Sequence, residues 1–192
     1  MIGKFKCLLV GCVLAQVISG CLTSAPPPPK SWVVSASRKG SSELMVDRVA
    51  RLGSISVAAP YDKPALAVKR KDGSVAFDPF NVFASSPSAL LRAPLAALLE
   101  DDGRFGRVMA SVSSARVNST VEAVVTDLSL DCREEGKRVA NVSVSLAVIE
   151  NREIKMFLDG AGSADALSGD YSAAFSEAFA EAVSEALKSM PK

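Results

Sequence analysis

The segment that most restricts the fold of this chain is its C-terminal stretch from Asp170 to Met190, where apolar residues recur with the period of an α-helix. The apolar positions that share one stripe are Tyr171, Phe175, Phe179, Val183, Leu187 and Met190. Alanines run beside this stripe at Ala174, Ala178, Ala182 and Ala186. The side expected to face water carries Glu177, Glu181 and Glu185. A helix of this kind must bury its apolar stripe, so the preceding chain has to supply a layer that covers it.

That layer is predicted from three alternating segments between residues 119 and 158, with turn residues at 134–137 and 151–152. The apolar residues expected on the inner face are Val124, Leu128 and Leu130, then Val142, Val144, Leu146 and Val148, then Ile154, Met156 and Leu158. The residues expected on the outer face include Val125, Asp127, Ser129, Asn141, Ser143 and Ser145. Antiparallel strands with a polar outer face need cover on the inner face only. The predicted fold is therefore α+β: one domain with a mostly antiparallel sheet and two main helices packed on one side.

The second main helix is predicted to begin at Ser86-Pro87, because serine is a preferred N-cap and proline is tolerated at the first helical position. It is expected to bury Leu91, Leu95 and Leu98, with Leu90 and Leu99 beside them, and to end at Gly103. Pro94 lies inside this helix and predicts a kink. Further short strands are expected over residues 31–36, 52–59, 65–69, 74–77 and 105–112.

The first 20 residues have the organisation of a secretory signal that ends in a cysteine. A basic head with Lys4 and Lys6 precedes an apolar run of about a dozen residues, which is shorter than the roughly 20 that a membrane-spanning helix requires. The run ends in Ile18-Ser19-Gly20-Cys21, which has the form of a bacterial lipobox. Residues 1–20 are therefore predicted to be a lipoprotein signal peptide and Cys21 the lipid attachment site.

Two alternatives bear on this N-terminal prediction. Cys12 also lies in a lipobox-like context, but cleavage there would leave an apolar core of only a few residues. A plain secretory signal with an incidental cysteine is the second alternative.

Residues 21–31 are predicted to form a lipidated tether, because Pro26–Pro29 favours polyproline II and acts as a semi-rigid spacer. Residues 32–190 then make up the folded domain.

Composition excludes several classes of function. The chain carries 22 Lys and Arg against 21 Asp and Glu, and this near-neutral balance without a basic cluster argues against nucleic acid as a partner. It contains no histidine, which excludes Ser-His-Asp triads, Cys-His pairs and zinc sites that use histidine. Asp159-Gly160-Ala161-Gly162 is rich in glycine but lacks the lysine of a P-loop. We expect no metal, no cofactor and no enzymatic activity.

Cys132 is the one cysteine that remains beyond Cys21, so the processed chain cannot form an internal disulfide. It continues the alternation of Leu128 and Leu130, which predicts a buried thiol. A reactive thiol or an intermolecular disulfide is the alternative.

Several short motifs recur in an order that is typical of one protein family. They are Ser31-Trp32-Val33-Val34, Ser54-Ile55-Ser56-Val57-Ala58-Ala59-Pro60-Tyr61, Val68-Lys69-Arg70, Phe80-Asn81-Val82-Phe83-Ala84-Ser85-Ser86-Pro87, Gly103-Arg104-Phe105 and the alanine-rich C-terminal helix. In these motifs the chain resembles the ABC-type transport auxiliary lipoproteins, the PqiC/YmbA-like group associated with MCE-type lipid transport, from about Trp32 to Leu187. The family usually has tryptophan where this chain has Phe83, so an aromatic side chain is kept.

The resemblance implies a role in the cell envelope without catalysis. Members of the family work beside MCE-domain proteins and ABC or integral-membrane components that move lipids between two membranes. For this chain it implies a docking module held by N-terminal acyl chains, with Phe80 and Phe83 as candidate partner-binding residues. Leu22, rather than aspartate, follows Cys21, which in enterobacteria-like sorting indicates the outer membrane, facing the periplasm. Assembly as a homo-oligomer stays open, and a lipoprotein of another envelope assembly or secretion system is the alternative function.

Overall fold

The computed structural model describes residues 26–36, 49–110 and 117–190. The predicted signal peptide, Cys21 and the start of the predicted tether therefore lie outside the described residues. Eight strands form one sheet: β1 Lys30–Trp32, β2 Val49–Val57, β3 Ala65–Lys69, β4 Val75–Phe83, β5 Arg107–Met109, β6 Ser119–Asp131, β7 Val139–Glu150 and β8 Glu153–Asp165. The described helices are α2 Pro87–Leu90, α3 Arg92–Asp101 and α4 Tyr171–Lys188.

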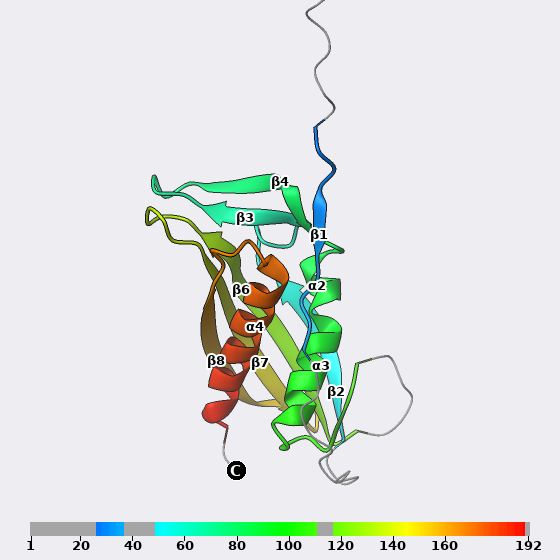
Figure 1. Cartoon of the computed structure of the whole chain (residues 1–192). Helices are drawn as coiled ribbons and strands as arrows, with labels where there is room; N and C mark the ends of the chain where they lie inside the picture. Colours follow the sequence, from blue (N-terminus) through cyan, green and yellow to red (C-terminus); the bar gives the residue numbers. More distant parts are fainter. Residues whose placement is uncertain (1–25, 37–48, 111–116, 191–192) are drawn as a thin grey trace, which may run out of the picture.

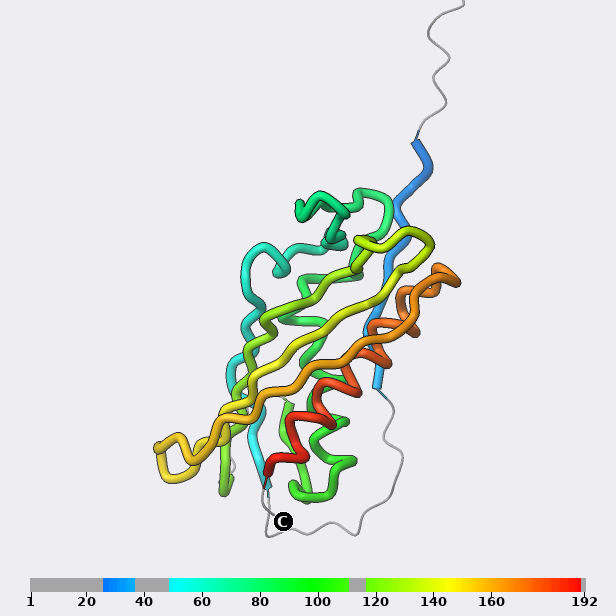
Figure 2. Tube along the Cα trace, turned by 90° about the vertical axis from the view of Figure 1, so that its left-hand side faces the viewer, coloured from blue at the N-terminus to red at the C-terminus, as the bar shows by residue number. Residues whose placement is uncertain are grey.

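Strand β6 is the centre of the sheet because it pairs with three other strands. On one edge it pairs with β7, which in turn pairs with β8. On the other edge β2 and β3 follow one another, with β2 beside residues 119–125 and β3 beside Leu130 and Asp131. β5 extends the sheet beyond β2, and β4 and β1 extend it beyond β3. The helices lie on one face of this sheet in Figure 1, and the turned view in Figure 2 shows β6, β7 and β8 without a helix in front of them.

The predicted α+β class and the one-sided arrangement of the helices are confirmed, but the prediction of a mostly antiparallel sheet is wrong. The sheet is mixed: β1–β4, β2–β5, β2–β6 and β3–β6 are parallel pairs, whereas β3–β4, β6–β7 and β7–β8 are antiparallel. Consecutive strands joined by tight turns pair antiparallel, as predicted. The parallel pairs join strands that are distant in sequence and need crossover connections, which alternation within one strand does not reveal.

Two register shifts reverse the predicted direction of side chains. Between Val125 and Asp127 the pairing of β6 with β7 slips, so Val125 is buried and Val124 is 43% exposed, the opposite of the prediction. A second shift between Val148 and Ile149 of β7 pairs Ile154 with Ile149. Ile154 is consequently 55% exposed instead of lying inside with Leu158. A bulge adds one residue and moves every following side chain to the other face, which explains both errors.

The predicted helix around Pro94 is divided into two. α2 ends at Leu90, and α3 begins at Arg92. A proline at position 94 cannot donate to the carbonyl of Leu90 and crowds that carbonyl, so the helix breaks one turn before it. Of the leucines predicted for the core, Leu91, Leu95 and Leu99 are buried, while Leu90 and Leu98 are half-buried.

Helix α4 lies across β7 and β8 and buries the predicted stripe from Tyr171 to Leu187. Asp170 caps its N-terminus by accepting a hydrogen bond from the Ala173 amide at 3.0 Å. Two glycines of β8, Gly160 and Gly162, lie directly beneath the helix and face the alanines of its stripe. The helix therefore approaches the sheet more closely than larger side chains would permit.

Candidate functional site

The N-terminal segment enters the domain at β1, which pairs in parallel with Asn81–Phe83 of β4. Trp32 holds this junction together. Its indole Nε1 donates to Asn81 Oδ1 at 3.1 Å, and its ring meets the edge of the Tyr171 ring at a centroid distance of 5.5 Å. The predicted tether is therefore shorter than expected, because Lys30 and Ser31 already belong to the sheet.

The chain beyond Trp32 is fastened to the N-terminal half of α4. The Ser35 amide donates to Ser176 Oγ at 2.9 Å, and Ser172 Oγ donates to the Val33 carbonyl at 2.6 Å. These bonds couple the entry of the N-terminal segment to the main helix of the domain.

Next to this junction, β4 contains a bulge that Asp78 holds in shape. The β3–β4 register jumps from Ala65–Val82 to Leu66–Asp78, which leaves residues 79–81 bulged out of the ladder. Asp78 Oδ1 accepts the Phe80 amide at 2.8 Å, and its Oδ2 accepts Asn81 Nδ2 at 2.7 Å. A chain of hydrogen bonds thus runs from Asp78 through Asn81 to Trp32.

The structure separates the two residues predicted to bind a partner. Phe80 is placed outward by the bulge and is 46% exposed. Phe83 is only 4% exposed, and its ring meets the edge of the Phe175 ring at a centroid distance of 5.4 Å. Phe83 is a core residue, which corrects its prediction as a contact residue, and Phe80 is the surface residue of the two.

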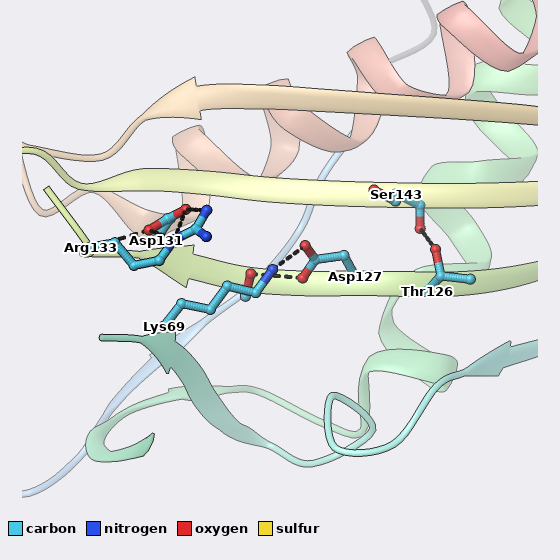
Figure 3. A network of polar contacts seen from close by, with 7 residues as sticks. Lys69, Thr126, Asp127, Asp131, Arg133 and Ser143 are labelled. Carbon is cyan, nitrogen blue, oxygen red and sulfur yellow. Dashed lines mark hydrogen bonds and ion pairs between the residues drawn. The ribbon is translucent and has the colours of Figure 1, made fainter. Parts of the chain in front are cut away.

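The open face of the sheet carries a polar network on β3, β6 and β7 (Figure 3). Lys69 Nζ lies 2.5 Å from Asp127 Oδ2, and both side chains are largely shielded. Ser129 Oγ donates to Asp127 Oδ1 at 2.7 Å. Ser129 is completely buried, so part of this network lies beneath the surface.

A second ion pair lies at the end of β6. Arg133 donates to the Asp131 carboxylate through Nε and Nη2, at 3.0 and 2.6 Å, as Figure 3 shows. The side-chain hydrogen bond from Arg133 is the main reason that the pKa of Asp131 lies below its ordinary value. Grooves of about 320 and 370 Å³ beside the two pairs share Asn141 and Ser163.

The same face becomes apolar toward the β7–β8 turn. Val124, Ile154 and Phe157 are 43%, 55% and 65% exposed. Phe157 is the cross-strand neighbour of Ala147, and Ile154 is the neighbour of Ile149. We call Val124, Ile154 and Phe157 the apolar patch. The two bulges turn Val124 and Ile154 outward, which is why alternation alone missed them. The outward direction of Phe157 follows from its alternation with Met156 and Leu158.

On the helical side, a groove of about 420 Å³ separates α3 from α4. Its lining includes the apolar residues Leu98, Val183 and Leu187 and the acidic residues Asp101, Asp102 and Glu177. The predicted glutamate row is exposed, although Glu181 also accepts the Ser163 amide of β8 at 2.7 Å. These carboxylates face solvent and the edge of the sheet.

Over residues 26–36, 49–110 and 117–190, no three His, Cys, Asp or Glu side chains gather in a way that could hold a metal ion. Within the same part of the chain, no helix is long and apolar enough to cross a membrane. Cys132 is a half-buried free thiol, and burial raises its pKa. Its burial is thus intermediate between that of the predicted buried thiol and that of an accessible thiol.

Comparison with known proteins identifies the fold. No family model matches the sequence, and no curated protein matches it. A crystal structure of protein XCC0632 from Xanthomonas campestris, of family DUF330, is similar over 83% of this chain and 90% of that chain, with a TM-score of 0.61 and 15% identity. The crystal structure of an uncharacterized protein is similar over 72% of this chain and 81% of that chain, with a TM-score of 0.57 and 13% identity. The chain shares its fold with these two proteins.

A third similar structure is a PelC dodecamer from Paraburkholderia phytofirmans, which covers 82% of this chain and 94% of that chain at 13% identity and a TM-score of 0.39. A similarity of this degree carries no argument about assembly. The PqiC/YmbA-like group does not appear among these structures, so the relationship established here is to the fold of the DUF330 protein.

Proposed function

We propose that this chain is a lipid-anchored envelope protein whose domain docks a periplasmic partner within an MCE/ABC-type intermembrane lipid transport system. The lipobox at Cys21 and the prolines that follow it support the anchor. The motifs shared with transport auxiliary lipoproteins support the system, and the fold shared with the DUF330 protein is compatible with it. In this proposal the acyl chains lie in the inner leaflet of the outer membrane, and the domain acts by binding and not by catalysis.

The observation that carries the docking role is the apolar patch on the uncovered face of the sheet. Three large apolar side chains on β6 and β8, the strands on either side of β7, are between 43% and 65% exposed, whereas the helices lie on the other face. Exposed apolar side chains mark interaction sites on proteins, and an aromatic residue commonly provides most of the binding energy. Phe157 is the aromatic residue of the three and the most exposed.

The location of the patch fits a partner away from the anchored membrane. In Figures 1 and 2 the β7–β8 turn lies at the end of the molecule opposite to the entry of the N-terminal segment. A domain tethered by its N-terminus would therefore present the patch toward the periplasm.

The test is recovery of partners from envelopes solubilised in mild detergent, using the full chain with a C-terminal tag. We expect an MCE-domain protein, or its ABC or membrane component, to be recovered with the wild type. Phe157→Asp should lower this recovery about tenfold or more, because a hot-spot residue is worth at least about 2 kcal/mol. Leu167→Asp is the matched control, since Leu167 is 53% exposed in the loop that precedes α4.

Recovery of unrelated assembly or secretion proteins would contradict the transport role and leave the anchored docking module in another envelope system. Equal recovery with Phe157→Asp and Leu167→Asp would show that the patch is not the docking surface.

A further inference from the structure

The corner of the domain at which the N-terminal segment enters has a surface of its own. In the β1–β4 register Lys30 is opposite Asn81, so the bulge that carries Phe80 lies next to the last proline before the domain. Figure 1 shows β4 beside β1 at one end of the molecule, and β1 is the edge strand of the sheet there. The described residues that directly precede β1 therefore lie beside β4.

This corner exposes apolar side chains along a single strand. Phe80 is 46% exposed, and Phe77 and Val75 are each 37% exposed. Pro79 is also exposed in the bulge. The bulge is not a loose loop, since Asp78 accepts hydrogen bonds from the Phe80 and Asn81 amides at 2.8 and 3.2 Å. The fold thus keeps an aromatic side chain projecting outward beside the tether.

Cationic side chains surround the same strand. Lys63 Nζ lies 4.7 Å from the centroid of the Phe77 ring. Lys30, Arg70 and Lys71 are exposed on β1 and on the β3–β4 turn. Cations together with exposed aromatic residues are typical of surfaces that lie at the interface of an anionic bilayer.

The carboxylates of this corner are engaged in local hydrogen bonds. Asp72 accepts from Ser74, at 2.9 Å from its amide and 2.6 Å from its hydroxyl. Asp78 is occupied by the bulge, and Asp62 accepts the Ser88 amide at 3.3 Å. These acidic groups serve turns and the start of α2, and Lys30, Lys63 and Lys71 are exposed.

We propose that this corner, formed by Phe80, Phe77, Lys63 and Lys30, is a membrane-contact surface that inserts Phe80 into the interface of a bilayer containing anionic phospholipid. The inference rests on the lipid anchor of the proposed function. Nine residue steps join Cys21 to Lys30, and nine steps span at most about 32 Å when fully extended. An acylated Cys21 would thus keep this corner no farther than that from the bilayer, and Phe80 is the exposed aromatic beside β1.

The test uses the full chain, purified from membranes and reconstituted into vesicles of phosphatidylethanolamine and phosphatidylglycerol with brominated acyl chains. Phe80→Trp is compared with Phe157→Trp, which introduces the same indole at a more exposed position at the opposite end of the domain. Trp32 is the one native tryptophan and gives the same background in both variants and in the wild type. We expect bromine quenching above this background to be at least threefold greater for Phe80→Trp.

Equal quenching of the two variants, or none above background for Phe80→Trp in a chain that floats with the vesicles, would overturn this inference and leave the anchor standing. A chain that does not float with the vesicles would overturn the anchor and this inference together. A matched pair of variants tests the role of the lysines. In the Phe80→Trp background, Lys63→Glu should lower bromine quenching at least twofold, whereas Lys155→Glu on β8 should not. Equal effects would overturn the role of the cations.

Discussion

Gly160 of β8 lies so close to Ala182 of α4 that a Cβ at position 160 would be 2.1 Å from the Ala182 carbonyl oxygen. One turn earlier in the helix, a Cβ at Gly162 would be 2.2 Å from the carbonyl oxygen of Ala178. Both contacts are with the helix backbone, which cannot move aside as a side chain can. The two glycines and the alanine stripe therefore set the distance between helix and sheet.

We predict that Gly160→Ala lowers the free energy of unfolding by about 3 kcal/mol, because the methyl group forces α4 away from β8. Urea denaturation followed by circular dichroism measures the change. Ala161→Val is the control, since Ala161 is exposed and lies between the two glycines. A Gly160→Ala protein as stable as the wild type would contradict this packing.

Arg92 gives a second prediction, because its guanidinium donates to three backbone carbonyls. Nε reaches Ala110 O at 2.6 Å, Nη1 reaches Gly53 O at 2.9 Å and Nη2 reaches Leu52 O at 2.8 Å. Arg92→Ala should lower the free energy of unfolding by about 2 kcal/mol, because these carbonyls lose charged donors.

Arg92→Lys should recover less than half of that loss, since an ammonium group cannot reproduce the planar fork. Arg70→Ala, at an exposed position, should remain within about 0.5 kcal/mol of the wild type. If Arg92→Lys were fully stable, a single charge at this site would suffice and the fork would not matter.

The pKa of Asp131 gives a prediction about acid stability. Its ordinary value is 3.8, and the Arg133 side chain lowers it in the folded state. A group whose folded pKa is lowered contributes stability above its unfolded pKa and loses it as the pH falls through the folded pKa. The urea midpoint of the wild type should therefore fall further between pH 6 and pH 3 than that of Asp131→Asn.

The control for this comparison is Glu153→Gln, because the Glu153 side chain is 73% exposed in its pair with Lys155. Surface pairs of this kind contribute little, so its pH dependence should match that of the wild type. An Asp131→Asn protein with the wild-type pH dependence would mean that the pair with Arg133 does not stabilise the fold.

Cys132 gives a prediction about reactivity. Burial raises its pKa above the ordinary 9.0, so less thiolate is present at a given pH than in the unfolded chain. Alkylation of Cys132 by iodoacetamide at pH 8 should be slower in the native protein than in urea, and its half-maximal rate should lie at a higher pH. Peptide mass spectrometry measures the alkylation of Cys132 separately from that of any other cysteine. A thiol introduced by Ser168→Cys in an exposed loop should react at similar rates in both states.

The sequence predicted best where neighbouring residues decide the structure. β7 was predicted with the correct faces, since Val142, Val144, Leu146 and Val148 are all buried. The hairpin turns were predicted as well, and the Asn151-Arg152 turn has φ values of 52° and 68°, as a tight β-turn requires. α4 was predicted within two residues at each end because its stripe and its Asp170 cap are local signals.

The candidate sites were predicted less well because they depend on contacts between distant segments. The apolar patch exists because two bulges turn Val124 and Ile154 outward, and a bulge leaves no mark in the alternation before it. Phe80 and Phe83 are both phenylalanines and lie three positions apart. Phe83 nevertheless packs against Phe175, whereas Phe80 is exposed to solvent. Gly160 and Gly162 lie opposite the Ala-x-x-x-Ala stripe of α4. The small residues in both segments of the sequence indicate close packing of the helix on the sheet.

The three residues of β1 have a mechanical consequence. A pull on the N-terminus acts along β1, whose hydrogen bonds to Asn81–Phe83 would be sheared together, while Trp32 and Ser35 pass the force to Tyr171 and Ser176 of α4. The sheet and its main helix would thus move as one body when the N-terminus is displaced, and motion at one end of the molecule would be transmitted to the other without unfolding between them.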